Sequence, residues 1–133
     1  MGVRSNDAQR VSGKQHFEHD LEINSHIAVT GDIPTLTVDT AGNGTCAISA
    51  TSSDTAGELT FSQTWANSDT LLVTFAKAYE NAPLVFLSNN GTDTDTGIAA
   101  IKYDAVAVTT TGFTITASGT CSGALNYLVI ETA

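Results

Sequence analysis

The residues whose types are best suited to chemistry lie close together near the N-terminus. Residues 16–20 read His-Phe-Glu-His-Asp, so the imidazoles of His16 and His19 lie beside two carboxylates. Imidazole nitrogens and carboxylate oxygens are common ligands of divalent transition metals, and trimerisation of this segment would turn each histidine into a ring of three nitrogens. Histidines that face solvent on an extended segment explain the pattern more simply, so we predict no metal and no other cofactor.

Two further places carry residues that often bind ligands. Asp93 and Asp95 lie in the loop NNGTDTDTG, which has fewer oxygen ligands than a calcium-binding loop motif needs, so we interpret it as a solvated turn. Trp65 follows the segment GELTFSQT and is the candidate ligand surface, because exposed aromatic rings stack on sugars and proteins. A lone tryptophan after a strand more often lies at the edge of the core or in a subunit contact, and this is the interpretation we prefer for Trp65.

The sequence lacks the motifs of common enzymes. It contains neither a Gly-x-Ser-x-Gly nucleophile elbow nor a glycine-rich phosphate loop. All three histidines lie within the first 26 residues, so the rest of the chain has no imidazole base. We therefore predict that the protein is not an enzyme and has no catalytic residues.

The two cysteines, Cys46 and Cys121, are too few for a zinc site and form no Cys-x-x-Cys motif. They would form a disulfide if the two segments that carry them lay side by side. Each could equally be a small buried apolar residue, as free cysteines usually are. The sequence leaves both possibilities open.

The charge of the chain excludes several classes of partner. The formal net charge is −9, and after His26 only Lys77 and Lys102 oppose ten carboxylates. Such a surface repels phosphate backbones and anionic lipids, so we expect neither nucleic acid nor membrane as a partner. No apolar run is long enough for a membrane helix, and the polar N-terminal residues do not resemble a secretory signal.

The composition changes at about residue 40, which divides the chain into an extended N-terminal arm (1–40) and a knob (41–133). Near its start the arm carries basic and aromatic residues suited to anchoring on a larger partner: Arg4, Arg10, Lys14 and Phe17. Further along, its apolar residues form one narrow stripe that needs a cover, and copies of the arm about a threefold axis would supply it. We therefore predict a homotrimer with a stem made by Leu21, Ile23, Ile27 and Val29.

The knob consists of short segments in which apolar and polar residues alternate, as they do in half-buried strands. Examples are residues 57–64, 68–79 and 124–133. Residues 83–91 (PLVFLSNNG) are denser in apolar residues, so we expect a strand buried on both faces. Six or seven such segments, separated by turns about every ten residues, predict an all-β fold: a single, jelly-roll-like β-sandwich.

Four segments of the knob also occur, in this order, in a known group of proteins. They are SDTAGELTF (53–61), LLVTFAKAYENAPLVFLS (71–88), TTTGFTI (109–115) and NYLVIE (126–131). The knob thereby resembles the β-sandwich knob of tailed-bacteriophage fibre and head-decoration proteins, and LEINSHIAVTGDIP resembles the stems of such fibres. The resemblance implies a virion part with threefold assembly and no catalytic residues.

Two functions follow from this resemblance. The first is a trimeric capsid-decoration or head-fibre protein on the capsid surface, which docks through its arm on the major capsid protein or another virion protein. The second is a tail-fibre tip or adhesin whose knob recognises a glycan or protein on the host surface. The short arm favours the first, because a long tail fibre needs a long shaft.

Overall fold

The computed structural model of the protein describes Glu18, Asp20 and residues 22–38, 45–65, 68–90, 102–103, 107–117 and 121–132. Within these ranges the regular elements are β-strands, and there is no helix long and apolar enough to cross a membrane. The strands are β1 (Thr35–Val38), β2 (Thr45–Ile48), β3 (Ala56–Trp65), β4 (Thr70–Thr74), β5 (Leu84–Asn90), β6 (Lys102–Tyr103), β7 (Gly112–Thr116) and β8 (Cys121–Ile130).

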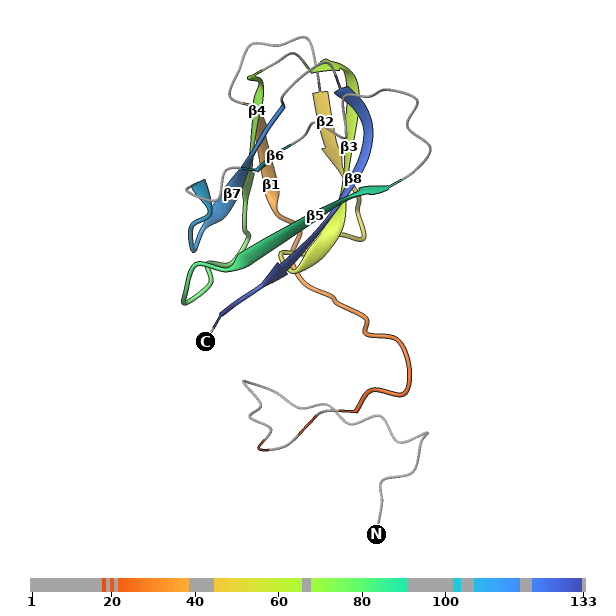
Figure 1. Ribbon diagram of the computed structural model, residues 1–133, viewed down its shortest axis with the longest axis vertical. Helices are drawn as coiled ribbons and strands as arrows, with labels where there is room; N and C mark the ends of the chain where they lie inside the picture. The colour runs from red at the N-terminus through yellow and green to blue at the C-terminus, as the bar shows by residue number, and fades with distance from the viewer. Residues whose placement is uncertain are drawn as a thin grey trace.

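The strands form two four-stranded sheets, which are the two layers in Figure 1. Sheet A has the order β1-β4-β7-β6 and sheet B the order β2-β3-β8-β5, and all neighbouring strands are antiparallel. Each sheet has one apolar face, and the two faces cover each other as in other β-sandwiches. The predicted all-β sandwich is confirmed.

Strand β1 belongs to the sandwich, whereas the expected boundary at residue 40 placed it in the arm. It pairs with β4 over its whole length, from Thr35 opposite Thr74 to Val38 opposite Leu71. The side chain of Leu36 packs against the core. Because β1 completes an edge of sheet A, the folded unit begins at about Pro34, which is itself buried.

The alternation read from the sequence matches the observed burial. In β4, Leu71 and Val73 are buried and Leu72 is exposed. In β8, Tyr127 and Val129 are buried, whereas their neighbours Leu128 and Ile130 are exposed. These strands each present one face to the core, as period-two alternation predicts.

The expectation that residues 83–91 are buried on both faces is wrong. In β5, Val85 is 2% exposed, but Leu84 and Phe86 are 53% and 51% exposed. The reason is topological, because β5 is the edge strand of sheet B and no described layer covers the outer face of that sheet. Double burial of a strand needs a cover on both faces of its sheet.

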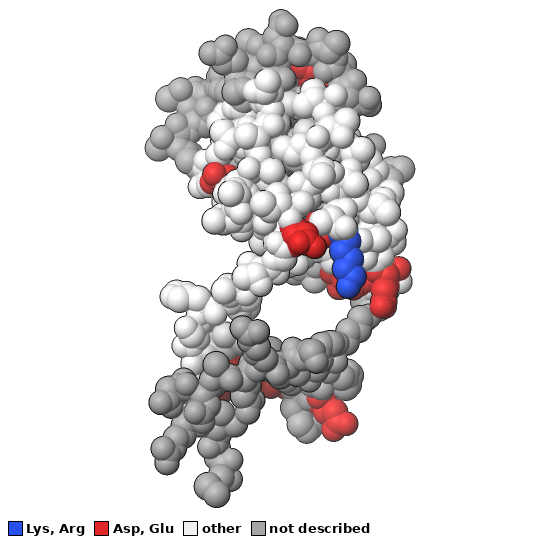
Figure 2. All heavy atoms as spheres, turned by 180° about the vertical axis from the view of Figure 1, so that it is seen from behind, with Lys and Arg blue, Asp and Glu red and all other residues white. Residues whose placement is uncertain are grey.

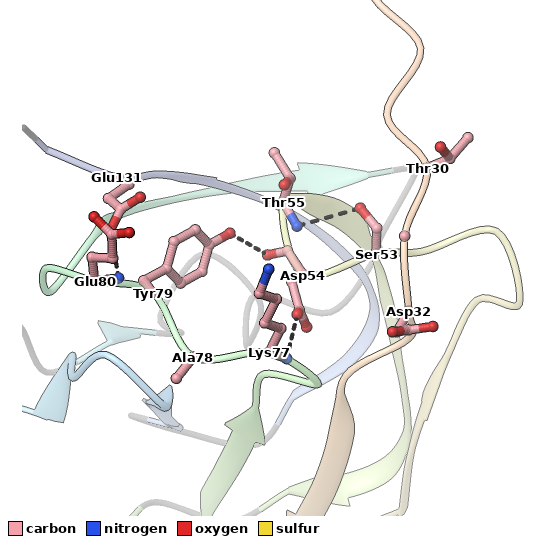
Figure 3. A pocket seen from close by; sticks show the side chains of 11 residues that line it. Thr30, Asp32, Ser53, Asp54, Thr55, Lys77, Ala78, Tyr79, Glu80 and Glu131 are labelled. Atoms are coloured by element: carbon pink, nitrogen blue, oxygen red, sulfur yellow. Dashed lines mark hydrogen bonds between the residues drawn. The ribbon is translucent and has the colours of Figure 1, made fainter. Parts of the chain in front are cut away.

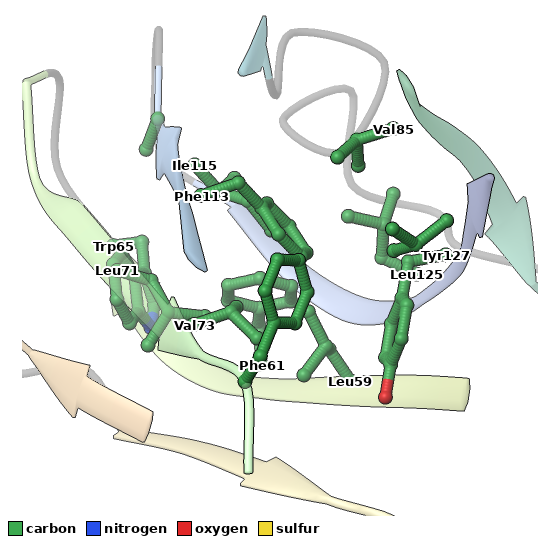
Figure 4. Packing of buried hydrophobic residues seen from close by; sticks show 13 residues of the cluster. Leu59, Phe61, Trp65, Leu71, Val73, Val85, Phe113, Ile115, Leu125 and Tyr127 are labelled. Carbon is green, nitrogen blue, oxygen red and sulfur yellow. The ribbon is translucent and has the colours of Figure 1, made fainter. Parts of the chain in front are cut away.

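The core lies between the sheets and contains Trp65, which agrees with its interpretation as a core residue and not with its alternative role as a ligand surface (Figure 4). Trp65 is 1% exposed, its indole N–H donates to the carbonyl of Thr45 at 3.3 Å, and its ring meets Phe61 edge-on at 5.2 Å. A tryptophan whose ring is covered and whose N–H is paired has no surface left for a ligand. The buried hydrophobic residues are Leu59, Phe61, Trp65, Leu71, Val73, Phe75, Val85, Phe113, Ile115, Ala117, Leu125, Tyr127 and Val129.

Of the two possibilities for the cysteines, the structure has the free thiol, because Cys46 is unpaired. Cys46 lies on β2 and Cys121 on β8, and β3 lies between these strands. Two strand spacings place the backbones of β2 and β8 roughly 9–10 Å apart, which is too far for a disulfide.

Burial raises the pKa of the Cys46 thiol from 9.0 to about 12. The unfolded chain therefore loses this proton near pH 9, whereas the folded chain keeps it until about pH 12, so stability is full below pH 9 and falls as pH rises through this window. Burial raises the pKa of Tyr127 in the same direction, from 10.0 to about 12.

We expect urea unfolding to show decreasing stability above pH 9 and a shallower decrease in Cys46→Ala. An equal decrease in both proteins would contradict the account.

Residues 22–34 form no strand, and the part of this segment before residue 30 extends away from the sandwich (Figure 1). Of the expected stem residues, Ile23, Ile27 and Val29 are 47%, 72% and 37% exposed, and Leu21 lies outside the described residues. An exposed apolar stripe is what the trimer prediction requires of a single chain, and the trimer itself stays a prediction. The expected anchoring and metal-binding residues, Arg4, Arg10, Lys14, His16, Phe17 and His19, also lie outside the described residues.

Candidate functional site

A hollow of about 380 Å³ lies at the end of the sandwich where the N-terminal segment leaves. Residues 30–32 form one wall, residues 53–55 and 77–80 form two others, and Glu131 follows the end of β8 (Figure 3). We call this hollow the acidic cup. Its size lies within the range of small-molecule sites.

The wall at 53–55 is a tight turn before β3. The amide of Ser53 donates to the carbonyl of Ala56 at 2.9 Å, and the Ser53 hydroxyl accepts from the amides of Thr55 and Ala56 at 3.3 Å each. Serine is suited to such turns because its short side chain bonds its own backbone. From β8, the phenol of Tyr127 donates to the carbonyl of Ser53 at 2.6 Å, which ties the turn to the core.

Gly57 allows this turn to pack closely on β8. A Cβ atom at this position would lie 2.4 Å from the Ser52 hydroxyl oxygen and 2.5 Å from the Tyr127 phenol oxygen. Any side chain would therefore push Tyr127 or the turn out of place. The position of the 53–55 wall thus depends on a residue outside the cup.

Asp54 holds the wall at 77–80. Its two carboxylate oxygens accept from the backbone amides of Ala76 and Lys77 at 2.7 and 2.8 Å, and its carbonyl accepts from the phenol of Tyr79 at 3.2 Å. The Tyr79 ring lies edge-on to the core residue Phe75, with centroids 4.9 Å apart. Hydrogen bonds to a charged acceptor are stronger than neutral ones, so Asp54 fixes this loop firmly.

Glu131 holds the same loop at its other end. One of its carboxylate oxygens accepts from the amides of Glu80 and Asn81 at 2.6 and 2.9 Å. The segment 76–81 is therefore suspended between two carboxylates that come from distant parts of the chain. Such a loop is preformed and does not have to be ordered when a ligand binds.

The cup is negatively charged. Its lining contains the carboxylates of Asp32, Asp54, Glu80 and Glu131 and one ammonium group, that of Lys77. Figure 2 shows a blue basic side chain beside red carboxylates at this end of the molecule. Burial and, to a smaller extent, the charges of Asp54 and Glu131 raise the pKa of Tyr79, so its phenol stays protonated and remains a donor.

The lining offers several kinds of group that can contact a ligand. It offers carboxylate and hydroxyl oxygens, one ammonium group and the apolar surfaces of Ala78 and Tyr79. The described residues that line it include no histidine or cysteine, and nowhere in the described part of the chain do three His, Cys, Asp or Glu side chains gather as a metal site would need. Polar groups placed around a small apolar surface are typical of small-molecule binding sites.

Of the site residues singled out in the sequence, those that the structure describes, Ile23, Ile27, Val29 and Trp65, do not line the cup. Trp65 lies in the core, and Asp93 and Asp95 lie outside the described residues. Most cup residues occur in SDTAG and AKAYENAP, and the others occur in LEINSHIAVTGDIP and NYLVIE. All four segments carried the resemblance, but none of these residues received a functional role. Their turn-forming Ser, Asp and Asn residues beside strands were the available signal, since binding residues often lie on loops.

Comparison with protein families gives a match to part of the knob. Residues 70–130 match the H-type lectin domain. This is a family of carbohydrate-binding β-sandwich domains, and the lectin match runs from β4 to β8 and includes the cup wall at 77–80. In searches of curated proteins and of solved structures, nothing matched the chain. The findings thus support a lectin-like β-sandwich, and nothing in them is specific to bacteriophages.

Proposed function

We propose that the protein is a non-catalytic, glycan-binding module that binds sugar in the acidic cup. This is the second of the two functions considered from the sequence, recognition of a surface glycan by the knob. The observation that carries the proposal is that the lectin match includes residues 77–80, the loop that Asp54 and Glu131 hold in place.

Carboxylate oxygens are acceptors that suit the many hydroxyl donors of a sugar, and charged acceptors form stronger hydrogen bonds than neutral ones. The exposed carboxylate of Asp32 and the carboxylate of Glu131 face the same hollow from opposite walls. Acceptors on opposite walls can contact two sides of one ring. The bound sugar would thus be oriented by side chains that the fold already holds in place.

The charge of the cup determines which sugars it accepts. A negative charge on the ligand about 4 Å from a carboxylate would weaken binding by about 1 kcal/mol, even at the dielectric constant of water. Four carboxylates line this hollow. Sialylated, sulfated and uronic-acid glycans are therefore disfavoured. The ligand class we propose is neutral sugars, with amino sugars also tolerated.

A glycan array probed with the labelled full chain tests this function. We expect binding to one or more neutral glycans and at least about tenfold weaker binding to their sialylated or sulfated counterparts, because several carboxylates repel the added anion. Neutral and anionic members of each pair should be compared at the same salt concentration, since salt screens such repulsion. Binding only to anionic glycans, or to none, would contradict the proposal.

We further propose that the N-terminal segment attaches the knob to a larger particle and that copies of the chain associate. This is supported by the extension of residues 22–29 away from the sandwich and by the exposure of Ile23 and Ile27. The virion location and the capsid partner expected from the sequence stay predictions. Imaging of isolated particles that carry the labelled protein would test them.

A further inference from the structure

The outer face of sheet B carries an apolar surface that the cup does not use. Leu84 lies opposite Ile130 and Phe86 opposite Leu128 on the neighbouring strands β5 and β8. Each of these four side chains is between 42% and 53% exposed. We call these four residues the outer patch.

Alternation and register place these side chains on one face. Within β5, Val85 lies between Leu84 and Phe86 and points into the core, and Val129 does the same between Leu128 and Ile130. Directly opposed residues of antiparallel strands lie about 4.5–5.5 Å apart on the same face. The patch is therefore continuous and is not a set of scattered apolar residues.

The surroundings of the patch carry almost no charge. The next outward-facing pair is Ser88 and Asn126, and on β3 Ala56 lies opposite Leu128. The carboxylate on this part of sheet B is that of Glu58, which accepts a hydrogen bond from the side-chain amide of Asn90. In a chain of net charge −9, carboxylates are sparse on this part of the described surface: Glu58 lies opposite Asn126, and Glu131 follows Ile130 at the end of β8.

The edge of sheet B that β5 forms is unusually long within the described structure. β5 has seven residues, whereas the other edge strands, β1, β2 and β6, have four, four and two. Natural sheets usually protect a long edge with charged side chains or proline, and β5 contains neither. A long uncharged edge next to an apolar face is a surface that a partner normally covers.

We infer that the outer patch is an interface with a second copy of this chain, with the outer faces of the two B sheets packed against each other. The acidic net charge of the chain favours a second copy over a basic partner at this patch. Two acidic chains repel over most of their surfaces and can approach closely where carboxylates are sparse, whereas a basic partner would be attracted to the carboxylates elsewhere.

The area of the interface indicates how far it extends. A stable interface buries about 800 Å² on each partner, which is more than four half-exposed side chains supply. The contact must therefore include the uncharged neighbours Ala56, Ser88 and Asn126, which together with the patch form an apolar centre and a polar rim. Sheets that pack face to face in this way occur in many β-sandwiches.

The interface would have a consequence for binding, although it does not depend on the proposed sugar site. Ile130 directly precedes Glu131, which lines the acidic cup. Association through the patch therefore places two cups close to the same contact. Paired cups would bind a surface that presents many sugars more tightly than one cup does.

Sedimentation velocity of the full chain over the micromolar range tests this inference. We expect an oligomer for the unmodified protein, and we expect Phe86→Asp and Leu128→Asp to raise its dissociation constant at least about tenfold, because each buries a charge at the contact. Leu72→Asp is the matched control, because Leu72 is 38% exposed on the outer face of the other sheet. Leu72→Asp should leave the mass of the oligomer unchanged.

Three outcomes would overturn the inference. They are a monomeric unmodified protein, patch variants that keep the oligomer, and an equal loss of the oligomer in Leu72→Asp. If Ile27→Asp dissociates the oligomer and the patch variants do not, the N-terminal segment makes the contact instead. Thermal unfolding of each variant checks its fold, and Leu84→Ser, which adds no charge, replaces any variant that fails to fold and should also weaken association.

Discussion

Phe113→Ala should lower the free energy of unfolding by about 3–5 kcal/mol, a large part of the 5–15 kcal/mol typical of a domain. Phe113 is 0% exposed on β7 of sheet A, and its ring centroid lies 5.8 Å from that of Phe75 and 6.0 Å from that of Tyr127. Tyr127 belongs to sheet B, so this ring joins the two layers. Removing it leaves a cavity between the sheets, which urea unfolding at neutral pH would measure.

Two variants provide the comparison for Phe113→Ala. Phe113→Leu keeps most of the apolar volume and should lose clearly less stability than the alanine variant. Leu72→Ala removes a 38% exposed side chain from the outer face of sheet A and should change stability by less than about 1 kcal/mol. A loss below about 1.5 kcal/mol for Phe113→Ala would mean that the described core does not hold the two sheets together.

Asp54→Ala should weaken sugar binding by at least about tenfold, because it removes hydrogen bonds worth about 1.5–3 kcal/mol each to a charged acceptor. The amides of Ala76 and Lys77 would lose their acceptors, and the loop that carries Tyr79 would no longer be fixed. Isothermal titration with the neutral sugar that the array identifies measures the change. Asp54→Asn keeps the shape of the side chain and one carbonyl oxygen. Its sugar affinity should lie between those of the unmodified protein and Asp54→Ala.

The control for Asp54→Ala is Asp20→Ala, which removes the same charge from an exposed position outside the cup. It should bind sugar like the unmodified protein. Unchanged affinity in Asp54→Ala would show that residues 77–80 are not part of the site. An equal loss in both variants would point to net charge as the cause.

Strand faces could be predicted from the sequence because alternation is a local property. Leu71 and Val73 were expected on one face and Leu72 on the other, and the structure confirms this. The alternation can be seen without knowing which strands pair with one another. The fold class followed from several such segments in a row.

The place of a strand in its sheet could not be predicted in this way. β1 was assigned to the arm because its partner, β4, lies more than thirty residues later in the chain. Phe86 was expected to be buried because an apolar run does not show whether its strand lies in the middle or at the edge of a sheet. The indole N–H of Trp65 donates to the carbonyl of Thr45, and this contact depends on the pairing of β2 with β3.

The acidic cup was missed for the same reason. Asp54 contacts the amide of Ala76 across 22 positions of the sequence, and Glu131 contacts the amide of Glu80 across 51. Each of these residues, taken alone, looks like an ordinary turn or surface residue. Only the packed sandwich brings the segments together, and no spacing rule describes such an arrangement.

The central claim, that the acidic cup binds sugar, is tested most directly by NMR titration of the ¹⁵N-labelled full chain with the neutral sugar that the array identifies. We predict saturable shifts of the amides at residues 53–55, 77–80 and Glu131, with no shifts at Leu84, Phe86, Leu128 and Ile130. Saturable shifts confined to other parts of the chain, or no shifts at sugar concentrations that saturate the array, would contradict the account.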